Sequence, residues 1–272
     1  MTVSPRQLPA AAGGNVAFRA AQPVAPFLGR AARQPEACVS PTDALRKGYL
    51  LYESRQYRPA IASFNQALKL QPREKLALHG RGLAHAQVGC YETAARDFER
   101  ALALCLEDPQ LWYNHGVALS HLKHHRRAIH SFDRSIELNP NSHHAWYNRS
   151  HALRSCGHYR AALENLNRVV YLKPDCCYAW RYRGFILSAM KRYPEAIASF
   201  NESLQINERN LSAWYGKAQA AVRFNDLESA IHCLHQTFRL NPVGYQHLVR
   251  SRREFDPVRS DGRFIDLISN LA

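Results

Sequence analysis

The sequence lacks any run of about eighteen apolar residues, the length that a transmembrane helix needs. It has no C-x-x-C pair, and its seven cysteines are an odd number, so neither a zinc ribbon nor a complete disulfide framework is indicated. We therefore expect a soluble protein of a reducing compartment, in the simplest case cytoplasmic.

Motifs of the common enzyme classes are also missing. The chain contains no H-E-x-x-H, no Gly-rich phosphate loop and no G-x-S-x-G. Two stretches are rich in histidine. Residues 121–125 are expected around a turn, and the side chains of 232–235 are expected to point in different directions from one helix. Both arrangements favour histidines exposed to solvent over a metal-binding site. The prediction is a protein that is not an enzyme and carries neither cofactor nor metal.

Acidic side chains are scarce, with 22 Asp and Glu against 36 Lys and Arg, a net charge of +14. Such an excess favours an acidic protein, an anionic membrane surface or nucleic acid as partner. Residues 1–40 hold no Lys, a single acid (Glu36) and no apolar periodicity. We predict a disordered Ala/Pro/Arg-rich tail there, with a transit peptide for a plastid or mitochondrion as the alternative.

What the sequence does contain is a period of 34 residues. It divides most of the chain into six gapless repeats: 41–74, 75–108, 109–142, 143–176, 177–210 and 211–244. The fourth position carries Trp112, Trp146, Trp180 and Trp214, and the eighth is always small: Gly48, Gly82, Gly116, Ser150, Gly184 and Ala218. The twentieth is always alanine, and the twenty-fourth is Phe64, Phe98, Phe132, Leu166, Phe200 or Leu234.

These positions resemble the signature of the tetratricopeptide repeat (TPR) family, whose members share this length and this order of Trp, Gly, Ala, Phe and Pro. The resemblance implies an all-α fold, a right-handed α-solenoid of helix-turn-helix repeats. Within the fourth repeat, apolar residues recur at helical spacing in two stretches, broken near Gly157 and stopped before Pro174. A single hairpin of this kind cannot bury its apolar face, so the repeats must stack.

The last stretch, 245–272, is predicted to cap the array. A further helix is expected to begin near Tyr245, and the segment after it resembles the tail that follows many TPR arrays. We expect four apolar side chains to cover the last repeat: Phe255, Val258, Phe264 and Leu267.

In TPR proteins the first helices of successive repeats line a concave groove that binds partners. The resemblance therefore implies these groove residues: Arg46, Tyr49, Tyr113, Asn114, Tyr147, Asn148, His151, Arg154, Tyr178, Arg181, Tyr182, Phe185 and Tyr215. Aromatic, amide and basic side chains suit an extended peptide with acidic groups and apolar anchors. The alternative for each tyrosine is packing against the adjacent hairpin.

Two groove types of the family can be compared with this chain. The carboxylate clamp needs Lys and Arg around its asparagines, and only Asn114 and Asn148 recur here, so that clamp is not expected. The same two residues are candidates for an asparagine ladder that holds a peptide backbone.

Three functions remain open. The leading one is a non-catalytic protein-interaction scaffold or adaptor that acts in assembly or regulation, as many long TPR proteins do. The alternatives are an RNA-binding helical-repeat protein and an architectural subunit of a larger complex. We expect the basic residues to be spread over both helices rather than to recur at one repeat position, which disfavours RNA. The sequence does not decide self-association.

Overall fold

The computed structural model describes residues 40–241 and 252–269, which contain helices and turns and no strand. The predicted tail, apart from Ser40, and the helix expected near Tyr245 lie outside the described residues. The helices of the repeats are α1 (Pro41–Glu53), α2 (Tyr57–Leu70), α3 (Lys75–Gln87), α4 (Tyr91–Leu102), α5 (Pro109–His121), α6 (His125–Leu138), α7 (His143–Ser155), α8 (Tyr159–Leu172), α9 (Cys177–Ala189), α10 (Tyr193–Ile206), α11 (Leu211–Arg223) and α12 (Leu227–Leu240).

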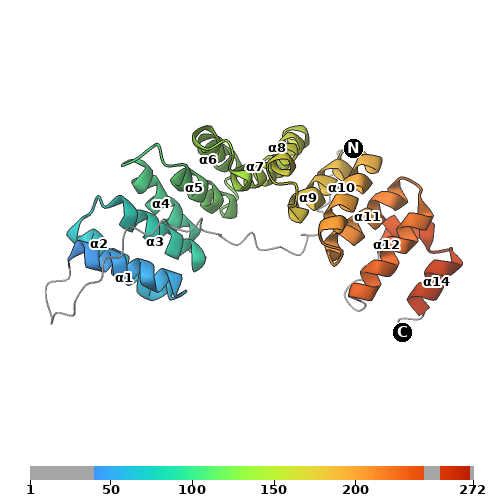
Figure 1. Ribbon diagram of the computed structural model, residues 1–272, viewed down its shortest axis with the longest axis horizontal. Coiled ribbons are helices and arrows are strands. Elements are labelled where there is room, and N and C mark those ends of the chain that lie inside the picture. Colours follow the sequence, from blue (N-terminus) through green and yellow to red (C-terminus); the bar gives the residue numbers. More distant parts are fainter. Residues whose placement is uncertain (1–39, 242–251, 270–272) are drawn as a thin grey trace, which may run out of the picture. The chain divides into compact units, whose positions relative to one another are not determined.

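The chain forms two bodies, Met1–Ala145 and Trp146–Ala272, and each is described by itself. In the first, α1 packs on α2, α3 on α4 and α5 on α6, while α2 and α4 also contact the first helix of the following hairpin (Figure 1). In the second, α9 packs on α10 and α11 on α12, with α8 against α9 and α10 against α11. This order of contacts confirms the predicted all-α fold of stacked helical hairpins.

The turn inside each hairpin uses one residue with left-handed backbone geometry. This residue is always the fifteenth of its repeat: Arg55, Gly89, Lys123, Gly157, Lys191 and Asn225, with φ between 59° and 83°. Glycine adopts this conformation without steric cost, whereas a side chain such as that of Lys123 is strained there by about 1–2 kcal/mol. The turn geometry is therefore imposed by the packing of the two helices and not by the turn residue alone.

The small residue at the eighth position lies directly against the large one at the twenty-fourth. A Cβ atom added to Gly116 would lie 2.7 Å from Phe132 Cε1, and Gly48 and Phe64 show the same relation at 2.6 Å. Both phenylalanines have no exposed surface. The two repeats with a larger residue at the eighth position carry leucine at the twenty-fourth: Ser150 with Leu166, and Ala218 with Leu234. The side chains at the two positions thus share one space, so a larger residue at the eighth position goes with a smaller one at the twenty-fourth.

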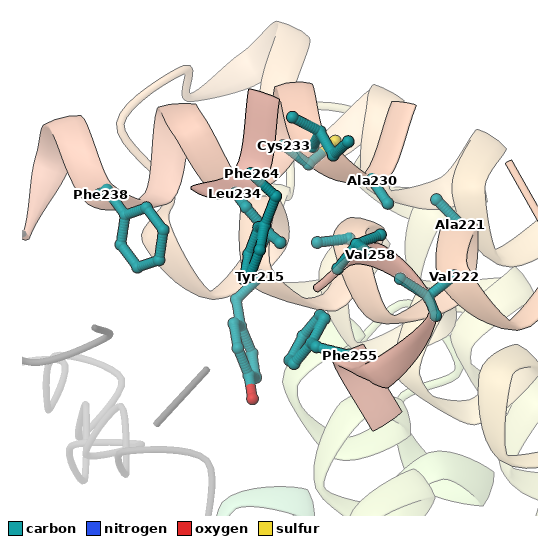
Figure 2. Packing of buried hydrophobic residues seen from close by; sticks show 12 residues of the cluster. Tyr215, Ala221, Val222, Ala230, Cys233, Leu234, Phe238, Phe255, Val258 and Phe264 are labelled. Atoms are coloured by element: carbon teal, nitrogen blue, oxygen red, sulfur yellow. The ribbon is translucent and has the colours of Figure 1, made fainter. Parts of the chain in front are cut away.

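The C-terminal segment closes the last hairpin. The 3₁₀ helix η1 (Arg253–Val258) contacts α11 and α12, and α14 (Gly262–Ser269) contacts α12. Phe255 and Val258 are fully buried and Phe264 is 2% exposed, in one cluster with Leu234 and Phe238 (Figure 2). The side chain of Leu267, also expected in this cap, lies outside the described residues. The cap removes the apolar face of the sixth repeat from water.

Candidate functional site

The tryptophans of the fourth position attach each hairpin to the preceding turn. The indole Nε1 of Trp112, Trp180 and Trp214 donates a hydrogen bond of 2.8 Å to the backbone carbonyl six residues earlier. Each indole thus satisfies a backbone carbonyl just after the end of the preceding helix, while its ring packs against its own helix. They therefore build the repeat and are not available to a ligand.

A basic residue stands at the seventh position of every repeat, contrary to the expectation that none would recur. The six are Lys47, Arg81, His115, Arg149, Arg183 and Lys217. Several lie over the tryptophan of their own repeat: the Arg183 guanidinium is 5.7 Å from the centre of Trp180, and Lys217 Nζ is 5.5 Å from that of Trp214. The column is visible in the sequence when the seventh position is compared across the six repeats.

Two arginines at the seventh position each bridge two hairpins. Arg81 Nε donates to Asp97 Oδ2 of its own hairpin at 2.8 Å, and Nη1 donates to Asn65 Oδ1 of the preceding hairpin at 2.7 Å. Arg183 makes the same pair of bonds, to Ser199 and to Asn167. In sequence, polar residues stand at the matching twenty-third and twenty-fifth positions of these repeats, which is the signal that could have revealed the bridges.

The third repeat uses histidine for this bridge. His115 Nε2 lies 3.3 Å from Glu99 Oε1 of the preceding hairpin, and its Nδ1 lies 3.1 Å from Ser131 Oγ. Burial lowers the pKa of His115, although the nearby Glu99 opposes the shift. Three members of the column are therefore engaged in bridges between hairpins, whereas Lys47 is exposed. Such a column does not form a continuous open basic stripe that could follow a phosphate backbone.

In the N-terminal body the candidate groove residues are largely engaged. Tyr49 donates from its hydroxyl to the carbonyl of Leu76 at 2.9 Å, and burial is the main reason why its pKa is raised. Asn114 is 2% exposed, and its Nδ2 donates to His79 Nε2 at 2.9 Å. Burial lowers the pKa of His79 to about 4, so its imidazole is neutral and can accept this bond. Asn114 therefore joins two hairpins.

Two further candidates of this body differ in exposure. Tyr113 is 7% exposed, with its ring tilted against that of Phe132 at 6.2 Å between centroids. Arg46 is half-buried on α1. The Tyr113 ring thus packs against the second helix of its own hairpin.

In the C-terminal body six candidates gather on α7 and α9. We call them the α7–α9 cluster: Tyr147, His151 and Arg154 of α7 with Tyr178, Arg181 and Tyr182 of α9. The rings of His151 and Tyr182 are stacked at 3.9 Å, and Tyr147 meets Tyr178 edge to face at 4.8 Å. The helical register explains the gathering, because 147, 151 and 154 lie on one face of α7, and 178, 181 and 182 on one face of α9.

The electrostatics of this cluster are set by burial and by two guanidinium groups. Burial, followed by Arg154 and Arg181, lowers the pKa of His151 to about 3. Burial raises the pKa of Tyr147 to about 12, against the opposing effect of Arg181. No carboxylate contributes to either shift. At neutral pH the cluster therefore holds a neutral imidazole, neutral phenols and two positive charges.

The two arginines are not neutralised within the protein. Among the described residues, neither Arg154 nor Arg181 forms an ion pair, and the Nε atom of each is buried without a hydrogen-bond partner. The Arg154 guanidinium lies 5.7 Å from the centre of the Tyr182 ring, a cation–π arrangement. Buried donors of this kind are normally satisfied, so an external acceptor is expected.

The remaining candidates serve the fold or lie beside the cluster. Phe185 packs edge to face on Phe200 at 5.2 Å, and Asn148 is half-buried on α7. Tyr215 is 7% exposed and faces Phe255 of the cap at 5.8 Å. Its hydroxyl lies 3.4 Å from Glu254 Oε1, to which Gln219 also donates at 2.6 Å. The cap therefore covers the first-helix face of the sixth repeat.

Within the described residues, no group of three or more His, Cys, Asp or Glu could hold a metal ion. His121 ends α5 and stacks on Tyr91 at 4.2 Å, while His125 begins α6. No helix in this part of the chain is both long and apolar enough to cross a membrane.

Comparison with known proteins bears on the fold. Tetratricopeptide repeat models match residues 45–113, 109–142, 131–164 and 177–210, and a protein prenyltransferase alpha subunit repeat model matches 159–190. No protein of curated function matches in sequence.

Solved structures share the architecture. YrrB, described as a TPR protein with an unusual peptide-binding site, is 23% identical, with TM-score 0.59 over 64% of this chain and 90% of that one. PilF of Pseudomonas aeruginosa is 17% identical, with TM-score 0.65 over 78% and 97%. MamA of Desulfovibrio magneticus RS-1 is 21% identical, with TM-score 0.60 over 62% and 96%. At these identities the likeness shows the fold.

Proposed function

Because the chain belongs to the tetratricopeptide repeat family, we propose that it is a non-catalytic scaffold or adaptor that binds an extended segment of a partner protein. The binding face is formed by first helices of the repeats, and the partner segment is acidic with apolar anchors. In this proposal, residues 1–40 are a tail, 41–244 the six repeats and 245–272 the cap. The protein acts in the assembly or regulation of a complex.

The observation that carries the proposal is the α7–α9 cluster. It combines aromatic faces with two arginines that have no ion-pair partner among the described residues. Aromatic rings hold apolar side chains and arginine holds carboxylates, which together match an acidic peptide with apolar anchors. The solved structure of YrrB adds that a protein of this fold has a peptide-binding site.

The compartment proposed is the cytoplasm. All described cysteines are free thiols: Cys90, Cys105, Cys156, Cys176, Cys177 and Cys233. Free thiols are typical of proteins in a reducing compartment.

Affinity capture with the full chain tests the function. Wild-type protein is compared with Arg154→Gln/Arg181→Gln and with Arg160→Gln/Arg209→Gln, a control that removes the same charge from exposed positions of the same body. We expect wild type and control to enrich the same partner from the native source, and the cluster variant to lose it at least about tenfold. An identical set of captured proteins for all three would contradict the proposed face.

A salt titration with single-stranded RNA tests the main alternative. Because Arg81 and Arg183 of the seventh-position column are used in bridges between hairpins, we expect no saturable RNA binding even at low salt. Saturable binding that weakens steeply with salt would favour the RNA function instead.

A further inference from the structure

We infer that the α7–α9 cluster is a carboxylate subsite, in which Arg154 and Arg181 together bind the side chain of one Asp or Glu within the partner segment. This inference rests on the proposed function and goes further by assigning the acidic group of the ligand to one place on the protein.

The two arginines of the cluster converge from different helices. Arg154 belongs to α7 and Arg181 to α9, yet both guanidinium groups act on the same imidazole, that of His151. His151 in turn lies flat on Tyr182, whose ring carries the Arg154 guanidinium 5.7 Å from its centre. Two cations from different helices are thus held near one point.

Two other half-buried arginines of first helices, Arg81 and Arg183, differ from Arg154 and Arg181 in their partners. Arg81 is met by Asp97 and Asn65, and Arg183 by Asn167 and Ser199. In the α7–α9 cluster the polar groups beside the guanidinium groups are neutral phenol hydroxyls, that of Tyr182 for Arg154 and that of Tyr147 for Arg181. Among the described residues, the Nε atom of each arginine and Nε2 of His151 are buried without a hydrogen-bond partner. Since these polar atoms are left unsatisfied, the cluster is incomplete without an anion.

The charges of the cluster favour the binding of an anion. Two positive charges near one buried imidazole repel each other, and the low local dielectric strengthens that repulsion. A carboxylate placed between the guanidinium groups converts the repulsion into two charge-assisted hydrogen-bonded pairs. The binding free energy is favourable because the arginines are already positioned and need little ordering.

The ligand is assigned to a peptide because of the surroundings of the cluster. From Tyr147 to Arg154 the cluster follows α7 for about 10 Å, which accommodates several residues of an extended chain. Tyr178 is half-buried and offers part of its ring beside the arginines. A free inorganic anion would use the charges but not this aromatic surface.

Selection from a random dodecapeptide library displayed on phage tests the inference with the intact chain. We expect the wild type and the Arg160→Gln/Arg209→Gln control to enrich peptides with Asp or Glu at a fixed place beside an apolar residue. For the best peptide, made with an amidated C-terminus, replacing that acid by its amide should weaken binding at least about tenfold in fluorescence anisotropy. Arg154→Gln/Arg181→Gln should bind both peptides equally weakly.

Outcomes of the selection separate the inference from the proposed function. Enriched peptides without an acid, or an acidic peptide bound equally well by the cluster variant, would overturn the carboxylate subsite while peptide binding by the protein stands. Displacement of the peptide by millimolar inorganic phosphate, with equal affinity for acid and amide forms, would assign the subsite to a free anion. Failure to enrich any peptide overturns the inference, and the capture experiment then judges the function independently. Circular dichroism melting of each variant verifies that it is folded.

Discussion

The imidazole of His151 lies parallel to the ring of Tyr182, with centroids 3.9 Å apart and planes inclined by 5°. This stacking holds the histidine in an environment where burial and two arginines keep it neutral. The same contact therefore links the packing of two repeats to the charge state of the candidate site.

Stability should fall in acid partly because of this histidine. The pKa of His151 is about 3 in the folded protein, against an ordinary value of 6.5. Between these values the unfolded chain binds a proton that the folded chain does not, so stability is lost as pH falls below about 6.5, by up to about 1.4 kcal/mol per pH unit. Urea unfolding of His151→Gln from pH 7 to pH 5 should show a smaller loss than wild type. As a control, His158→Gln alters an exposed histidine before α8 and should lose as much stability in acid as the wild type. An equal loss of stability in the His151 variant would count against the prediction.

The pair at the eighth and twenty-fourth positions predicts a coupled effect. Gly116→Ala places a methyl group where Phe132 Cε1 is 2.7 Å away, and such overpacking costs about 1–3 kcal/mol, in part offset by the better helix propensity of alanine. Phe132→Leu should make room for that methyl group, as in the repeat that combines Ala218 with Leu234. The free energies of unfolding from a double-mutant cycle should show a favourable coupling of about 0.5–3 kcal/mol. Strictly additive changes in the free energy of unfolding would contradict the idea that the two side chains share one space.

The hairpin turns predict a stabilising substitution. Lys123 has a φ of 64°, in the left-handed region, where glycine is unstrained. Lys123→Gly should therefore raise the stability by about 1 kcal/mol, because the strain that is released exceeds the cost of the larger chain entropy of glycine in the unfolded state. Gly157→Ala at the equivalent turn, where φ is 82° and no atom lies within 4 Å of the added Cβ, should lower it by strain alone. Thermal melts that shift in the opposite directions would contradict this account of the turns.

The bridge between hairpins predicts a large loss when one partner is removed. Asp97 is 3% exposed and is paired with Arg81, so Arg81→Met leaves a buried carboxylate without its partner and should cost about 3–5 kcal/mol. Arg81→Met/Asp97→Leu removes both charges and should be more stable than the single variant. As a control, Arg192→Gln breaks an ion pair between exposed side chains and should change the denaturation midpoint little. If the single variant were as stable as the double variant, the ion pair between Arg81 and Asp97 would not matter for stability.

The fold was predictable because its determinants repeat at fixed spacing. Gly116 and Phe132 are each visible in the sequence, and a small residue at the eighth position with a large apolar one at the twenty-fourth recurs in all six repeats. The bridges are also encoded by spacing, because Asp97 and Asn65 each lie 16 residues from Arg81. A basic residue alone does not indicate such a bridge, since its polar partners stand on other helices.

The candidate site was predicted only as a set of positions. Asn114 was expected to face a ligand, but its amide reaches His79 of the preceding repeat, a pairing that depends on how two helices approach. The gathering of His151, Arg154 and Arg181 depends likewise on the contact between repeats. Burial and two arginines set the pKa of His151, and no carboxylate of the described residues is among its causes. These effects depend on three-dimensional neighbours, which a single sequence does not order.

The face that binds the partner can be identified most directly by site-specific photocrosslinking. p-Benzoyl-phenylalanine replaces either Tyr178 in the α7–α9 cluster or Tyr171 on the second helix α8, which is 73% exposed and serves as the matched control. After irradiation in extract of the native source, quantitative mass spectrometry identifies the attached proteins. We predict that a partner is trapped from position 178 and not from position 171. Trapping from position 171 alone, or equally from both, would contradict the claim that first helices form the binding face.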